Sequence, residues 1–594
     1  MPRLAPTFVL NRKYAGDDDR SRYTDLLFHN GVLYATNGYD GNVEAWSVTG
    51  GGLSRFSSAS HPRTAAAGVV ARLSAVEFGG SDYLISGGGG TGVLTAFGVG
   101  SNGAITGSNE IGTYSVWAGD MGGMVSHVLN SGDVAVYGAL TNGNGIGQIR
   151  FSSSGTVEHA WKVTDTASIS TQAGVDLAAA VIAGSQFVFS AGTTDVGLTS
   201  WSVQNDGSLQ AVATLSASEN LWVSAPTCLE VSVVDGRTFL IMAAAGTNSL
   251  TVVEVNVLGG MRVVDHVLDN LNTRFNNVQA MDTVRFGELT YVVAGGSDGG
   301  VTVFLLLPDG HLIEQGTMVD TAQSSLANVS AIEAQATGSG LAIFVTSASE
   351  IGVTRLQYDL GAAGSVYSGS DGSDVLTGGN QTDILDGGDG SDVLSGGGGN
   401  DVLSDGAGND TLTGGSGADT FVFSRDGDTD TIIDFDPLND RIDLSQWYGL
   451  RGASQLEIAT LADGFQLVFG DETLLVRSSN WGSNTISTLP ETALIGVDRI
   501  SMVPEPIPNN STPDVSPYQE SGTPNDDRMI APNRNSILRG RAGDDQIVGG
   551  NGTDELYGGD GNDTLISGGG MGNIIYGDAG NDTIYVGAIW DLDL

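Results

Sequence analysis

The chain has 594 residues, with 69 acidic and 24 basic side chains and a formal net charge of −45. This charge argues against nucleic acid or an anionic membrane surface as a partner, because both attract basic surfaces. The length allows several domains. Cys228 is the single cysteine, which excludes intrachain disulfides and a zinc cluster of cysteines. No run of about eighteen apolar residues is present, so we expect no segment that spans a membrane.

Residues 1–363 repeat with a period of about fifty residues. Each unit reads as an apolar strand, a glycine-rich turn, an alternating strand and a turn into a last strand, with a further strand ahead of it. The units begin at positions spaced by 50 to 53 residues, namely Val32, Tyr83, Val134, Phe187, Phe239, Tyr291 and Leu341. Seven four-stranded units of near-constant length predict an all-β fold that opens with a seven-bladed β-propeller.

A run of small sandwich modules is the alternative to this propeller. About fifty residues are few for an independent core, and no proline-rich linker separates the units, so the sequence favours the propeller. The stretch 6–14, PTFVLNRKY, is a spare strand that is available to close the ring by joining the last blade. In the spacing of its strands and turns, the stretch 294–312 (AGGSDGGVTVFLLLPDGHL) resembles the blades of lactonase-like propellers, and this resemblance covers the fold only.

A nine-residue phrase, G-G-x-G-x-D-x-U-x with U apolar, fills residues 369–422 six times and residues 540–585 five times. Its glycines permit backbone angles closed to other residues, so the chain turns tightly and exposes its carbonyls. Two units make one coil, which stacks aspartates that lie eighteen residues apart. Such aspartates repel each other unless a dication binds between them, and Ca²⁺ accepts about six to eight oxygen ligands from carboxylates and carbonyls.

The pattern predicts two parallel β-rolls filled with calcium ions, and it resembles the repeats of RTX proteins. A flexible linker is the alternative, but a linker has no reason to keep an apolar residue at the eighth place. The candidate calcium ligands at the sixth place are Asp374, Asp383, Asp392, Asp401, Asp410, Asp419, Asp545, Asp554, Asp563, Asn573 and Asp582. The candidate ligands in the glycine turns are Gly388, Gly390, Gly397, Gly399, Gly406, Gly408, Gly550, Gly552, Gly559 and Gly561.

Residues 414–445 depart from the phrase and resemble the capping segment of serralysin-type secreted proteases, with ADTFVF followed by DTIIDFDPLNDRIDLS. We expect its apolar members to cover the open end of the roll; they are Ile432, Ile433, Phe435, Ile442 and Leu444. The predicted domains are a propeller (1–363), a first roll with its cap (364–445), a β-hairpin region (446–502), a proline-rich linker (503–524) and a second roll with a tail (525–594).

The N-terminal twenty residues lack the apolar run of a secretory signal peptide. Weak calcium sites need the calcium concentration found outside cells. The resemblance to RTX proteins therefore implies export by a type I secretion apparatus, and the tail YVGAIWDLDL resembles a signal of that kind. We expect a secreted or cell-surface protein.

No H-E-x-x-H motif and no P-loop are present, so the sequence predicts no catalytic residue and no cofactor other than Ca²⁺. Two functions fit. In the first, the propeller is a platform for an extracellular protein or glycan, with a surface, matrix or adhesion role. In the second, it is an extracellular hydrolase or lyase whose active site lies at the channel mouth. A channel with three or more converging His, Asp, Glu or Arg side chains would favour the second.

Overall fold

The computed structural model describes residues 8–14, 23–37, 42–49, 52–60, 72–87, 93–113, 121–141, 145–164, 174–193, 196–450, 452–478, 518–531, 536–549, 554–567 and 573–586. They belong to two compact units, Met1–Val503 and Pro504–Leu594. Across these ranges, helix is confined to single turns at Ala217–Glu219 and Ala453–Gln455. The predicted all-β fold is therefore confirmed. No helix in the described ranges is both long enough and apolar enough to cross a membrane.

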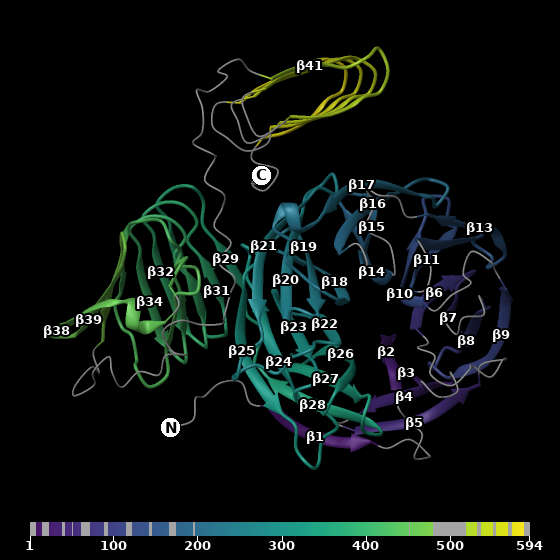
Figure 1. The fold of residues 1–594 in the computed structure, drawn as a ribbon, viewed down its shortest axis with the longest axis horizontal. Coiled ribbons are helices and arrows are strands. Elements are labelled where there is room, and N and C mark those ends of the chain that lie inside the picture. The colour runs from purple at the N-terminus through teal and green to yellow at the C-terminus, as the bar shows by residue number, and fades with distance from the viewer. Residues whose placement is uncertain are drawn as a thin grey trace. The chain divides into compact units, whose positions relative to one another are not determined.

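Seven four-stranded antiparallel sheets form the propeller ring (Figure 1), as predicted. Blade 1 contains β2 (Tyr23–His29), β3 (Val32–Asn37), β4 (Val43–Thr49) and β5 (Gly52–Ala59). Blade 2 contains β6 (Arg72–Phe78), β7 (Ser81–Gly87), β8 (Val93–Val99) and β9 (Ile105–Thr113). Blade 3 contains β10 (Met121–Val128), β11 (Val134–Leu140), β12 (Ile146–Phe151) and β13 (Val157–Val163).

The remaining blades follow the same order. Blade 4 contains β14 (Gly174–Ile182), β15 (Ser185–Gly192), β16 (Gly197–Val203) and β17 (Leu209–Leu215). Blade 5 contains β18 (Pro226–Val234), β19 (Arg237–Ala244), β20 (Ser249–Val255) and β21 (Met261–Leu268). Blade 6 contains β22 (Ala280–Phe286), β23 (Leu289–Gly295), β24 (Gly300–Leu306) and β25 (Leu312–Val319). Blade 7 contains β26 (Val329–Thr337), β27 (Gly340–Ser347), β28 (Val353–Asp359) and the N-terminal β1 (Phe8–Tyr14).

Strand β1 closes the ring, as the spare strand in the sequence suggested. It pairs antiparallel with β28, with Leu10 opposite Leu356. Middle strands such as β23 are buried along their whole length. Their near-continuous apolar sequences follow from this position, because neighbouring blades cover both faces of each sheet.

The first roll consists of two parallel sheets built from strands of three to six residues. One sheet contains β29 (Val366–Ser368), β31 (Ile384–Asp386), β33 (Val402–Ser404), β35 (Thr420–Val422) and β37 (Arg441–Asp443). The other contains β30 (Val375–Thr377), β32 (Val393–Gly398), β34 (Thr411–Ser416) and β36 (Thr429–Ile432). Residues eighteen apart pair in register, as in Leu385 with Leu403 and Leu394 with Leu412. All four of these leucines point into the roll and are fully buried.

The residue at the seventh place of the phrase is exposed in one sheet and buried in the other. On the β30 side the seventh-place residues Val375 and Val393 are 76% and 45% exposed. On the β29 side the seventh-place residues Ile384 and Val402 are buried. They belong to the apolar cluster that also contains Leu289 of blade 6. The first roll therefore shares a core with the propeller.

Three further strands continue the β30 sheet beyond the repeats. These are β38 (Glu457–Leu461), β39 (Gly464–Phe469) and β40 (Glu472–Arg477), and β40 pairs parallel with β36. Four of the five apolar cap residues are buried as expected: Ile432, Phe435, Ile442 and Leu444. The expectation for Ile433 was wrong. It is 46% exposed, because it follows the inward-facing Ile432 and so points to the other face of the sheet.

The second roll, in the other unit, also has two parallel sheets. One sheet contains β41 (Tyr518–Ser521), β43 (Ser536–Ala542), β45 (Glu555–Asp560) and β47 (Ile574–Ala579). The other contains β42 (Arg528–Ile530), β44 (Gln546–Val548), β46 (Thr564–Ile566) and β48 (Thr583–Tyr585). Its interior contains Leu538, Ile547, Leu556 and Leu565. Strand β41 begins inside the stretch 503–524 predicted as a linker; residues 503–517 of that stretch lie outside the described residues.

Candidate calcium centre

Hydrogen bonds between successive coils hold the repeat aspartates of the first roll in place. The backbone N–H of Asp374 donates to Oδ1 of Asp392 at 2.7 Å, and that of Asp392 donates to Oδ1 of Asp410 at 2.6 Å. On the opposite edge, Asp383 donates to Asp401 and Asp401 donates to Asp419, both at 2.9 Å. The predicted stacking of residues eighteen apart is therefore present on both edges.

The second roll contains the same hydrogen-bonded stacks. The N–H of Asp545 donates to Oδ1 of Asp563 at 2.8 Å, and that of Asp563 donates to Oδ1 of Asp582 at 3.0 Å. On its other edge, Asp554 donates to Oδ1 of Asn573 at 2.8 Å. The structure thus brings all eleven predicted sixth-place residues into four stacks.

The second carboxylate oxygen is what makes these stacks candidate metal sites. Among the described residues, Oδ2 has no hydrogen-bond donor in Asp392, Asp401, Asp410, Asp419, Asp545 and Asp563. These six residues are at most 2% exposed. Leaving a buried charged oxygen without a partner is costly. The first coil differs, because Oδ2 of Asp374 accepts from Ser370 N–H at 2.7 Å and Oδ2 of Asp383 accepts from Gly379 N–H at 2.6 Å.

The glycines let these turns stack closely. Gly397 has φ +97° and Gly399 has φ +126°, and a Cβ on them would lie 2.4 Å from the Gly379 carbonyl oxygen and 2.1 Å from that of Gln381. Positive φ recurs at the other predicted turn glycines that the structure describes, Gly388, Gly390, Gly406, Gly408, Gly559 and Gly561. Gly550 and Gly552 lie outside the described residues. A side chain at these places would separate the coils.

Burial also disturbs the protonation of these carboxyls. It raises the pKa of Asp401 to about 8 and the pKa values of Asp410 and Asp419 to about 6. The same cause raises the pKa values of Asp392, Asp545 and Asp563. A bound dication would remove this penalty. Because the available donors are carboxylate and carbonyl oxygens, the residues fit Ca²⁺ rather than a metal that prefers nitrogen or sulfur.

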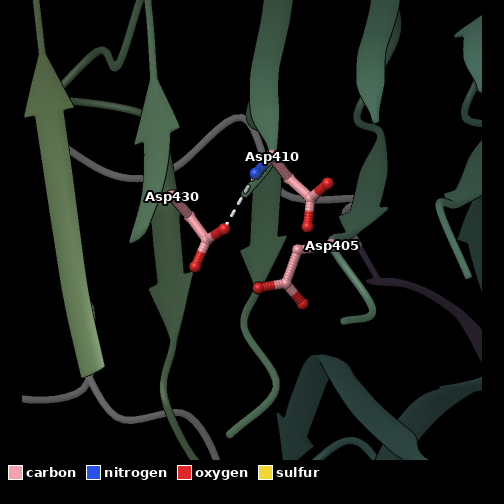
Figure 2. A group of neighbouring side chains, drawn as sticks. All are labelled: Asp405, Asp410 and Asp430. Carbon is pink, nitrogen blue, oxygen red and sulfur yellow. Dashed lines mark hydrogen bonds between the residues drawn. The ribbon is translucent and has the colours of Figure 1, made fainter. Parts of the chain in front are cut away.

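Two carboxylates that the sequence reasoning missed complete one site. Asp405, Asp410 and Asp430 offer oxygens that all lie within 4.8 Å of one another (Figure 2), and all three residues are buried. Asp405 occupies the first place of its unit, where the phrase has glycine, so this departure was visible in the sequence. Asp430 lies twenty residues after Asp410. Its Oδ1 accepts a hydrogen bond from the backbone N–H of Asp410 at 3.0 Å, and this contact is visible only in the structure.

A second candidate site lies where the innermost strands of the propeller meet. These strands surround a cavity of about 440 Å³. The charged side chains that line it are Asp25, Arg72, Asp176, Glu230, Asp282 and Glu333. Five carboxyl groups and one guanidinium therefore converge from six blades, which meets the criterion set for the enzyme reading.

Three of these carboxylates also connect blades. Oδ2 of Asp25 accepts from Leu73 N–H at 2.8 Å, Oδ2 of Asp176 from Leu229 N–H at 2.9 Å, and Oδ2 of Asp282 from Ala334 N–H at 2.6 Å. Burial raises the pKa of Asp282 to about 7. Burial, followed by the charge of Asp282, raises the pKa values of Glu230 and Glu333 well above their usual range. Burial raises the pKa values of Asp25 and Asp176 as well, so all five carboxyls hold their protons more tightly than exposed ones do.

Comparison with known proteins agrees with the roll geometry. The family model of the RTX calcium-binding nonapeptide repeat matches four stretches, residues 362–394, 395–430, 533–565 and 567–588. No curated protein matches the chain.

Solved structures of other propellers cover part of the chain. The periplasmic gluconolactonase of Pseudomonas aeruginosa is 13% identical, with a TM-score of 0.41 over 54% of this chain and 97% of its own. A candidate 6-phosphogluconolactonase of Bacteroides fragilis is 12% identical, with a TM-score of 0.39 over 53% of this chain and 95% of its own. We draw no argument about activity from these similarities. The chain combines a seven-bladed β-propeller with RTX calcium-binding repeats that fold as parallel β-rolls.

Proposed function

We propose that this is a secreted calcium-dependent protein in which the rolls fold on extracellular Ca²⁺ and the charged channel of the propeller is the functional site, either as a binding platform or as the centre of a hydrolase or lyase. The observation that carries the calcium part is the set of buried Oδ2 atoms for which no donor is found among the described residues. In each of these carboxylates, the other oxygen, Oδ1, already accepts a hydrogen bond from the coil before it. The stacks are therefore preformed for a cation in the folded roll and have no reason to form without one.

The expected affinity of the calcium sites indicates that the rolls fold outside the cell. Weak extracellular calcium modules have dissociation constants of about 10⁻⁴–10⁻³ M, so cytosolic calcium leaves them empty. Empty rolls contain closely stacked carboxylates and few apolar side chains, which favours a disordered chain. A disordered chain suits passage through a type I secretion apparatus. Calcium outside the cell then folds the rolls and prevents the chain from sliding back.

Hydrogen exchange on the full chain tests the calcium part. With excess Ca²⁺, peptides from the rolls and the blades are expected to be protected. With EDTA, peptides covering 369–422 and 540–585 are expected to lose protection first, while those from blades 1–4 keep it. Rolls that stay fully protected in EDTA would contradict the proposal. For export, a chain without residues 587–594 is compared with the full chain in cells that carry a type I apparatus, and equal secretion would remove that route.

The channel supports a second candidate, a hydrolase or lyase. Carboxyl groups whose pKa values are raised by burial, as those of Asp282, Glu230 and Glu333 are, can serve as general acids. Among the charged side chains that line the channel, Arg72 is the one cation, and it already pairs with Asp25 at 3.2 Å, so a phosphoester is disfavoured and a neutral glycan or lactone is favoured. The same surface suits a binding platform for neutral or cationic ligands.

Matched variants separate platform from enzyme. Glu230→Gln and Glu333→Gln keep the side-chain shape in the channel, and Glu77→Gln changes an exposed glutamate on the innermost strand β6. Neutral glycans and lactones are offered to the calcium-saturated protein, and both binding and turnover are measured. Turnover that falls in the two channel variants but not in Glu77→Gln supports the enzyme. Binding without turnover supports the platform.

A further inference from the structure

We propose that Asp405 adds a third carboxylate to one calcium site of the first roll, and that this site binds Ca²⁺ more tightly than the repeat sites around it. We call the group Asp405, Asp410 and Asp430 the Asp405 site (Figure 2). The inference rests on the proposed calcium function and goes beyond it, because the nine-residue phrase assigns no ligand to its first place.

Two departures from the phrase coincide at this site. Asp405 replaces the first-place glycine, and the coil stacked on it is two residues longer, so that Asp410 pairs with Asp430 at a separation of twenty residues rather than eighteen. In an ordinary unit there is no room for a first-place side chain. A Cβ on Gly396 would lie 2.4 Å from Oδ2 of Asp401 and 2.7 Å from the Gly414 carbonyl oxygen. We infer that the longer coil makes room for the Asp405 side chain.

Hydrogen bonds orient the Asp405 carboxylate within this space. Its Oδ1 accepts from Gly406 N–H at 2.7 Å and from Ser424 N–H at 2.9 Å. Ser424 belongs to the longer coil, so that coil orients the extra carboxylate as well as making room for it. Oδ2 of Asp410, at 2% exposure, has no donor among the described residues.

The charge of the site then calls for a cation. Three buried carboxylates lie within 4.8 Å of one another, and in the described ranges no ion pair joins a basic side chain to any of them. Like charges at such distances must be neutralised by protons or by a cation. Calcium affinity rises with the number of charged ligands, and the first place of an ordinary repeat unit is a glycine that offers no carboxylate. A third carboxylate therefore favours Ca²⁺ more strongly, and a trivalent lanthanide more strongly still.

A tryptophan beside the site provides a local signal. The indole N–H of Trp447 donates to the Ser424 carbonyl oxygen at 3.0 Å, and Ser424 donates to Asp405. Terbium bound at the Asp405 site is therefore close enough to receive energy from this indole. Excitation of tryptophan should produce terbium luminescence that is lost in Trp447→Phe, which assigns the signal to this site.

The experiment titrates Tb³⁺, and then competing Ca²⁺, into the full chain and three variants. Asp405→Gly restores the glycine of the phrase, Asp405→Asn keeps the shape without the charge, and Asp359→Asn removes the charge of an exposed aspartate at the end of β28 as a control. We expect the Trp447-sensitised site to bind about tenfold or more weakly in both Asp405 variants and unchanged in Asp359→Asn.

The outcomes separate this inference from the proposed function. If the unaltered chain takes up no Ca²⁺, the proposed function fails and the inference with it. If the unaltered chain binds and both Asp405 variants bind equally tightly, only the inference is overturned, and Asp405 is then not a ligand of the site. Circular dichroism with saturating Ca²⁺ checks that each variant has folded.

Discussion

The backbone N–H of Asp392 donates to Oδ1 of Asp410 at 2.6 Å, while Oδ2 of Asp410 has no donor within the described residues. The two oxygens of one carboxylate therefore have different roles: the first joins two coils, and the second is left for a cation. Because the same division recurs along the stacks, the folding of the rolls and their calcium uptake depend on the same side chains.

This division predicts the effect of replacing aspartate by asparagine. In a chain with Asp392→Asn, Asp401→Asn and Asp410→Asn, each amide oxygen can still accept the coil-to-coil hydrogen bond, but three charges are lost. We expect calcium-driven folding of the first roll to need a higher Ca²⁺ concentration and to become less cooperative, as followed by circular dichroism. Asp359→Asn, which removes the charge of an exposed aspartate outside the rolls, is the control. An unchanged calcium midpoint would exclude these aspartates as ligands.

The pKa shifts predict opposite pH dependences with and without calcium. Burial raises the pKa of Asp401 to about 8 and of Asp419 to about 6, above the value of about 3.9 for an exposed aspartate. The metal-free folded roll therefore binds these protons more tightly than the unfolded chain, and its stability falls as pH rises from about 4 through about 8. In EDTA, we therefore expect the first roll to be unfolded at about pH 8 and to gain structure only as the pH is lowered to about 5.

With saturating Ca²⁺ the order should reverse, because protons compete with the ion for the same oxygens. Calorimetry at both pH values, with and without the ion, checks the pair of results. A metal-free roll that gained stability with rising pH would mean that these carboxyls are not protonated in the folded state.

The inward orientation of the eighth place predicts that two substitutions differ in their effect on stability: one at the eighth place of a unit, and one at the seventh place of the unit before it. Leu403 is buried and Val393 is 45% exposed. Leu403→Ala should lower the free energy of unfolding of the calcium-loaded first roll by about 2–5 kcal/mol. Val393→Ala should change it by at most about 0.5 kcal/mol. Chemical denaturation of the full chain, followed at the roll by hydrogen exchange, measures both, and equal effects would contradict the inward orientation of the eighth place.

Ring closure predicts the effect of removing β1. Deletion of residues 1–14 would leave β28 with an unpaired edge, which invites pairing with another chain. We expect a lower melting temperature of the propeller and self-association in sedimentation experiments. Deletion of residues 1–7 leaves β1 in place and is the control. A deletion variant that stayed monomeric with an unchanged melting temperature would show that the closing strand adds little.

Periodicity made most of this fold predictable from the sequence. The period near fifty residues located the blades, and the eighth-place apolar residues located the interiors of both rolls. The seventh place carried less information, because Val393 and Val402 read alike while only Val402 meets the propeller. That contact depends on packing between segments distant in the chain, which no local pattern encodes.

The sites divide in the same way. The stacked aspartates followed from a fixed spacing of eighteen residues, and the structure brings them together as expected. Asp430 was not predicted as a ligand, because its coil is two residues longer and the spacing of eighteen residues no longer holds there. Glu230 and Glu333 escaped for another reason: they come from separate blades, and their approach is a property of the closed ring.

The closing strand has a consequence for how the molecule could fail mechanically. A ring built from consecutive blades has one seam, and here it lies in blade 7, where the first strand meets β28. The apolar cluster that contains Leu341 and Tyr358 of blade 7 also contains Ile384 and Val402 of the first roll. The calcium-dependent roll therefore packs against the blade that contains the seam of the ring. Loss of calcium should therefore remove packing from blade 7, and the ring is then expected to open at the seam, where the first and last strands of the propeller meet.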